Sequence, residues 1–73
     1  MSAFDTALHG LRALIADGAL RPGDRLPSEG ELCETLGVSR GSLREAIRML
    51  AALGVLETRH GSGSYVSELR AAD

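Results

Sequence analysis

Three arginines recur at four-residue intervals in this 73-residue sequence, and they form its most chemically specific pattern. On an α-helix this spacing places Arg40, Arg44 and Arg48 in a line along one face. A guanidinium group can bind a phosphate or donate two parallel hydrogen bonds to a guanine, so the line predicts contact with double-stranded nucleic acid. The alternative is an ordinary solvated helix face, because charges at this spacing are common.

The residues beside Arg40 suit the first turn of such a helix. Ser39 can cap the helix and can also donate a hydrogen bond to a phosphate, and Gly41 and Ser42 follow it. The free backbone N–H groups of a first turn, with the helix dipole behind them, favour an anionic phosphate. We therefore expect Ser39, Arg40, Gly41, Ser42, Arg44 and Arg48 to face nucleic acid.

A glycine-rich segment at residues 60–63 is the second candidate for contact. His60 and Gly61 could place an imidazole ring and bare backbone against a minor groove. The alternative is a flexible hairpin turn in which glycine simply permits a positive φ. Arg59 and Tyr65, on either side of the segment, are weaker candidates, since each could face solvent or cover a sheet.

Hydrophobic spacing predicts the elements that would position these side chains. Apolar residues recur every three or four positions over residues 4–17, 29–36 and 39–53, which predicts three helices. Residues 55–59 and 64–67 flank the glycine-rich segment and predict a hairpin, and the extended pieces around Pro22-Gly23 could add a strand. The prediction is a mainly α winged helix-turn-helix with a two- to three-stranded antiparallel sheet, residues 39–53 as recognition helix and 60–63 as the wing.

Local signals support the connections between these helices. Ser28 followed by Glu31 is a capping-box pattern that begins the second helix, and Gly37 ends it. Only a few residues then separate the second and third helices, as in a helix-turn-helix. The buried face of the third helix is predicted to consist of Leu43, Ala46, Ile47, Leu50 and Leu53.

Composition limits the classes of protein that fit. The formal net charge is −2, but residues 39–61 carry four arginines against two acids, so positive charge gathers where contact is predicted. The single cysteine, Cys33, permits no internal disulfide or cysteine cluster for zinc, and it fits a core position better than a redox sensor. Without a signal peptide or membrane span, we expect a cytoplasmic location.

Several spaced segments resemble the GntR family of bacterial transcription regulators. Residues 18–29, which read GALRPGDRLPSE, resemble the family signature that precedes the helix-turn-helix. Residues 37–40 and 43–46 resemble the core of its recognition helix, whereas 53–56 and 60–66 resemble its wing. The resemblance is highly specific because these segments occur in the family's order, and the FadR-like branch is the most similar.

The resemblance implies a dimeric repressor or activator, and we expect a repressor. A DNA-binding domain over residues 1–67 would bind a short palindromic operator, and residues 68–73 would begin a linker to an absent C-terminal domain that binds a metabolite. This sequence departs from the family at Gly30, where arginine is common, and at Gly41, where threonine or proline is frequent. The DNA-facing positions that the resemblance implies are Ser39, Arg40, Gly41, Ser42, Arg44, His60 and Gly61.

Two other classes of function are weaker fits. An enzyme would need a nucleophile, a base and an orienting group close together, but His9, Cys33 and His60 are scattered, so we expect no catalytic residue, cofactor or metal ion. A winged-helix module that binds another protein usually lacks a basic outer face on its third helix. The dependence of affinity on salt separates this module from a DNA-binding domain.

Overall fold

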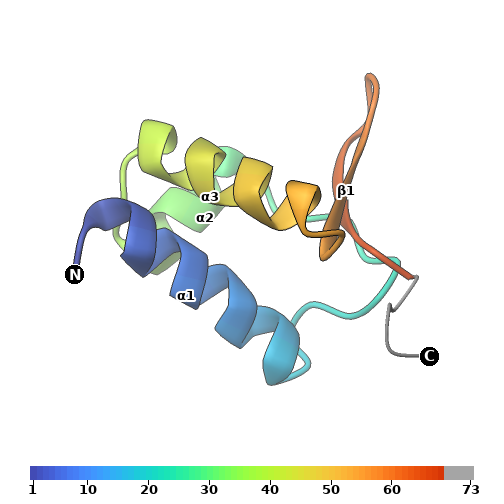
Figure 1. Cartoon of the computed structure of the whole chain (residues 1–73), viewed down its shortest axis with the longest axis horizontal. Coiled ribbons are helices and arrows are strands. Elements are labelled where there is room, and N and C mark those ends of the chain that lie inside the picture. Colours follow the sequence, from blue (N-terminus) through green and yellow to red (C-terminus); the bar gives the residue numbers. More distant parts are fainter. Residues whose placement is uncertain (69–73) are drawn as a thin grey trace.

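The computed structural model describes residues 1–68 and shows three helices followed by a β-hairpin (Figure 1). Each predicted boundary lies within one residue of the observed one, and the winged helix-turn-helix is confirmed. The predicted linker over 68–73 lies, except for Glu68, outside the described residues. The elements are α1 (Ala3–Ala16), α2 (Glu29–Leu36), α3 (Arg40–Ala52), β1 (Leu56–Arg59) and β2 (Gly63–Val66).

Each helix begins at a serine whose side-chain oxygen accepts a backbone N–H from three residues further on. These N–H groups have no partner inside the helix, so the serines satisfy donors that would otherwise need water. The caps of α2 and α3 were predicted from Ser28 and Ser39. The cap of α1 was not: Ser2 and Asp5 form a reciprocal capping box, which is why α1 begins at Ala3.

The hydrophobic core lies where α1 packs against α3 and where the base of the hairpin closes over α3. Leu11, Leu43 and Leu50 are fully buried in it. Ile47, also predicted for the buried face of α3, is half-buried and packs against the edge of the core. The prediction is wrong for Leu53, which caps the helix with 65% of its surface exposed. Among residues 1–68, no helix has the length and hydropathy to cross a membrane.

The sheet consists of β1 and β2 in antiparallel register, with Leu56 opposite Val66 at its base. The predicted additional strand is reduced to a single bridge between Arg25 and Tyr65. Three hydrogen bonds of 2.8 Å hold this segment to β2: Gly23 N–H donates to the Val66 carbonyl, Leu26 N–H to the Ser64 carbonyl, and Val66 N–H to the Asp24 carbonyl. The segment extends no further as a strand because Ser28, two residues after Leu26, already caps α2.

Candidate nucleic-acid interface

A tight turn between α2 and α3 presents the N-terminus of α3 to solvent. Gly37 ends α2 with φ at +69°, a left-handed conformation that glycine adopts without strain. Ser39 then caps α3: its Oγ lies 3.3 Å from the N–H of Ser42 and 3.2 Å from that residue's Oγ. Gly41, in the exposed first turn, has nothing within 4 Å of where a Cβ would lie, so the backbone there is open to a ligand.

The arginine line is on the outside of α3, as predicted: Arg40, Arg44 and Arg48 are all exposed. Two of the three are nevertheless bound to one carboxylate. Arg40 Nη1 lies 3.1 Å from Glu29 Oε1, while Arg44 donates from Nε to Oε2 at 2.7 Å and from Nη2 to Oε1 at 2.9 Å. Arg48 forms no ion pair with any carboxylate in the described part of the chain.

These contacts fix the charge of the cluster formed by Glu29, Arg40 and Arg44. The hydrogen bond from Arg44 is the main reason that the pKa of Glu29 falls from 4.5 to about 2, and the same pair raises the pKa of Arg44. Glu29 is therefore ionised at neutral pH, and the cluster carries a net charge of +1 rather than +2. Since all three side chains reach solvent, their contribution to folding stability is small and weakens with salt.

Gly30 lies beside this cluster in the first turn of α2. A Cβ at this position would be 3.5 Å from Arg40 Nη2. That separation is ordinary van der Waals contact, so Arg40 Nη2 lies close to the first turn of α2. The departure from the family pattern at Gly30 thus coincides with the place where Arg40 leans toward α2.

The hairpin places the second candidate segment at its tip, which projects away from the helices (Figure 1). His60 and Gly61 are both exposed there, as predicted. Arg59, beside the tip, is held in place: its Nε lies 2.9 Å from Glu57 Oε1, and its guanidinium lies 4.0 Å from the centre of the Tyr65 ring. The base of the tip is therefore ordered by a cation–π contact that the sequence did not predict.

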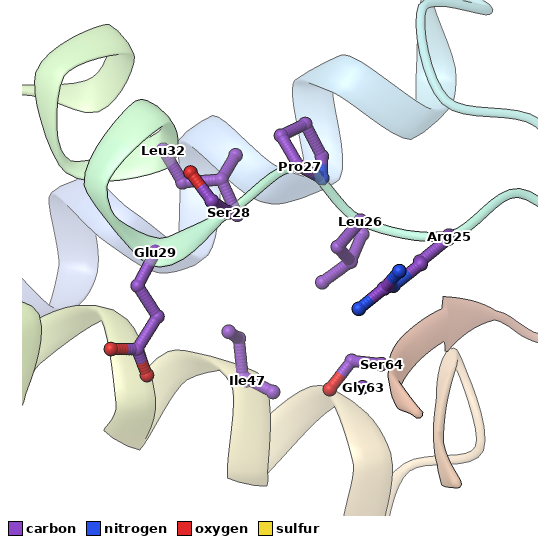
Figure 2. Close-up of a pocket in the computed structure, with 9 residues that line it drawn as sticks. All are labelled: Arg25, Leu26, Pro27, Ser28, Glu29, Leu32, Ile47, Gly63 and Ser64. Carbon is purple, nitrogen blue, oxygen red and sulfur yellow. The ribbon is translucent and has the colours of Figure 1, made fainter. Parts of the chain in front are cut away.

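A cleft of about 430 Å³ separates the start of α2 from the hairpin, with α3 as its floor. Figure 2 shows Glu29 on one side and Arg25 on the other, with Ile47 of α3 between them. Arg25 lies against the hairpin backbone, since a Cβ on Gly63 would come within 3.2 Å of its Nε. Arg25 forms no ion pair with the carboxylates of residues 1–68.

The structure therefore groups most of the predicted residues and adds two. Ser39, Arg40, Gly41, Ser42 and Arg44 share the N-terminal half of α3, Arg48 continues their line, and His60 with Gly61 occupies a separate element. Glu29 and Arg25 were missed. A charge complementary to the arginine line was the available signal for Glu29, although sequence spacing alone does not select it from ten acidic residues. No group of His, Cys, Asp and Glu within residues 1–68 could hold a metal ion.

A family model matches most of this chain, and individual relatives are similar to it. The sequence model described as "Bacterial regulatory proteins, gntR family" matches residues 5–66. The Escherichia coli repressor MngR, of the mannosyl-D-glycerate transport/metabolism system, is 48% identical over 60 residues, covering 82% of this chain and 25% of the relative. The E. coli Glc operon transcriptional activator is 43% identical over 65 residues, covering 89% and 26% respectively.

A solved structure shares the fold as well as the sequence. The crystal structure of AraR(DBD) in complex with operator ORX1 superposes with a TM-score of 0.81 at 30% identity, covering 92% of this chain and 81% of that one. This chain spans about a quarter of the length of the two curated relatives, so the match is to one domain of each.

Proposed function

Because this chain belongs to the gntR family of bacterial regulatory proteins, we propose that it binds operator DNA with α3 in the major groove and the hairpin tip at the adjacent minor groove. The observation that carries the proposal is the arrangement of α3 and the hairpin. The N-terminus of α3 is exposed, the outer face of the helix carries the arginine line, and the hairpin projects beyond its C-terminal end. The operator bound by the similar AraR domain supports the same partner.

The exposed residues of α3 divide into a base contact and several phosphate contacts. Arg40 is in the first turn, where a recognition helix enters the groove, and its fork matches the O6 and N7 atoms of guanine. Arg44 and Arg48 lie one and two turns further on and suit phosphates along the groove wall. The open backbone at Gly41, with the capped N-terminus around Ser39 and Ser42, lets a phosphate approach the helix dipole.

The cleft has a natural role in this arrangement. When one element lies in the major groove and its neighbour in the minor groove, the sugar–phosphate strand between the grooves must pass over the gap that separates the two elements. Arg25 lies in that gap and forms no ion pair within residues 1–68. We assign Arg25 to a phosphate of this strand, and His60 and Gly61 to the minor groove beyond it.

The proposal also covers the whole protein, of which this domain would be one part. Since the chain matches about a quarter of each relative, the effector site and the main dimer contacts would belong to a further domain. A homodimer would place two copies of this domain on a short palindrome, and a metabolite bound to the further domain would change the affinity for DNA. The relatives include both a repressor and an activator, and we propose a cytoplasmic repressor.

Fluorescence anisotropy tests the proposal directly. A palindromic duplex selected by this chain from a randomised pool is compared with a scrambled duplex at several salt concentrations. The expected result is a preference for the selected duplex, and an affinity whose logarithm falls with log salt at a slope of about −0.9 per phosphate contact. If the selection yields no duplex that binds at protein concentrations up to about 10⁻⁴ M, the chain would fit a protein-interaction module instead.

Replacing Arg25 by methionine tests the phosphate contact in the cleft. Methionine is an unbranched side chain without charge, so we expect equal weakening on both duplexes and a salt slope smaller by about 1. Arg12→Met, which removes an exposed arginine from α1, is the matched control and should change neither slope nor preference. A salt slope for Arg25→Met equal to that of the control would exclude the contact.

A further inference from the structure

The cluster at the start of α3 places a carboxylate among the side chains that face DNA. A carboxylate there repels phosphates, so attraction to DNA alone does not account for Glu29. Its contribution to stability is also small, because the ion pairs are at the surface and Ser28 already caps α2 through the N–H of Glu31. The geometry of the three side chains indicates a different role.

The hydrogen bonds leave the two arginines with different free donors. Arg40 uses only Nη1 for Glu29, so the edge that carries Nε and Nη2 remains available for two parallel hydrogen bonds. Arg44 uses one N–H of Nε and one of Nη2, so Glu29 occupies its Nε/Nη2 edge and leaves the donors at the Nη1 end. Gly30 adds no side chain next to Arg40 Nη2, since a Cβ there would be 3.5 Å from that atom. Glu29 thus leaves the Nε/Nη2 edge free of carboxylate on Arg40 and occupies the same edge on Arg44.

From this arrangement we propose that Glu29 determines specificity as a positioning residue, holding Arg40 in a base-reading geometry while its charge weakens binding to DNA of other sequence. The inference rests on the proposed function, since it concerns how the same surface discriminates between duplexes. A fixed fork loses less rotamer entropy on the matching base than a mobile one. On other sequences, the negative charge of Glu29 reduces the attraction between the two arginines and the phosphates, and Arg40 forms no base contact that compensates for this loss.

The decisive variant is Glu29→Gln, measured by anisotropy on the selected and scrambled duplexes. Loss of the charge is expected to raise affinity for the scrambled duplex about two- to fivefold, the range of exposed charge pairs. Release of Arg40 should lower the affinity ratio between selected and scrambled duplexes about three- to tenfold. Glu34→Gln is the matched control: it removes the same charge from an exposed position on α2 that forms no ion pair with either arginine, and it should leave the ratio unchanged.

A double-mutant comparison separates positioning from simple charge. If Glu29 acts on discrimination through Arg40, then adding Glu29→Gln to an Arg40→Ala chain should leave the affinity ratio unchanged, although affinity for the scrambled duplex should still rise. Equal ratios for Glu29→Gln and Glu34→Gln would overturn the inference. So would an equal loss of affinity on both duplexes with unchanged thermal melting, since that result would make Glu29 a DNA contact itself. A wild-type chain that binds no duplex would overturn the proposed function and this inference together.

Discussion

Replacing Leu43 with alanine is expected to lower the free energy of unfolding by about 2–5 kcal/mol, the largest stability loss that we predict for α3. Leu43 is fully buried between α3 and its neighbours, so truncation removes apolar contacts and leaves a cavity. A domain of this length has a total stability of about 4–11 kcal/mol at ordinary values per residue. Thermal or urea unfolding should therefore show a marked shift, of about 4–8 °C per kcal/mol in a thermal scan.

Leu53, the C-cap residue of α3, allows a matched comparison. Leu53→Ala removes the same atoms from a side chain that is 65% exposed, so its cost should be within about 0.5 kcal/mol of zero, as for other surface substitutions. The difference between the two variants reports mainly on burial, because both remove the same side-chain atoms. If Leu43→Ala melted no lower than Leu53→Ala, the packing of α3 in the core would be wrong.

The sequence was sufficient for the elements of the fold because their signals are local. Serine caps, apolar spacing and glycine stops act within a few residues of the positions they control, as at Ser28, Ser39 and Gly37. The same signals located the exposed start of α3, and so the predicted contact residues there. Ser2 shows that a local signal can still be overlooked, since its capping box joins it to Asp5 only three positions further on.

Features that depend on packing were not predictable in this way. Helical spacing placed Ile47 and Leu53 on the buried face, but spacing does not say how far the core extends along α3, and both lie at its edge. The contacts of Glu29 with Arg40 and Arg44 join residues 11 and 15 positions apart, so they exist only once α2 is docked on α3. The position of Arg25 against the hairpin depends in the same way on the bridge to Tyr65.

These packing contacts also determine the net charge of the surface that is proposed to contact DNA. A net charge of −2 argues weakly against nucleic acid, and the local excess of arginine argues for it. In the folded chain, Glu29 from outside the basic segment neutralises one of its charges, while Arg25, also from outside, lines the cleft between α3 and the hairpin. The charge of the contact surface is therefore a property of the tertiary structure rather than of either half of the sequence.

Arg40→Ala is expected to give the largest loss of DNA discrimination, about 1–3 kcal/mol at one base pair of each half-site. The fold should tolerate the change: Arg40 is exposed, and Glu29 keeps both of its hydrogen bonds from Arg44. The measurement is a set of anisotropy titrations in which each base pair of the selected half-site is replaced in turn. Wild-type protein should lose affinity sharply at one position, and Arg40→Ala should be indifferent to the same replacement.

Arg44→Ala is the control variant for the loss of discrimination expected from Arg40→Ala. Glu29 occupies the Nε/Nη2 edge of Arg44, which lies one turn beyond Arg40 and suits a phosphate, so its loss should weaken selected and scrambled duplexes alike and reduce the salt slope by about 1. Arg40 and Arg44 share a helix face, a charge and a carboxylate partner, so general electrostatics would make the two variants equivalent. Uniform weakening by Arg40→Ala across all base replacements would make it a phosphate contact, and sequence would then have to be read elsewhere, with His60 at the hairpin tip the next residue to replace.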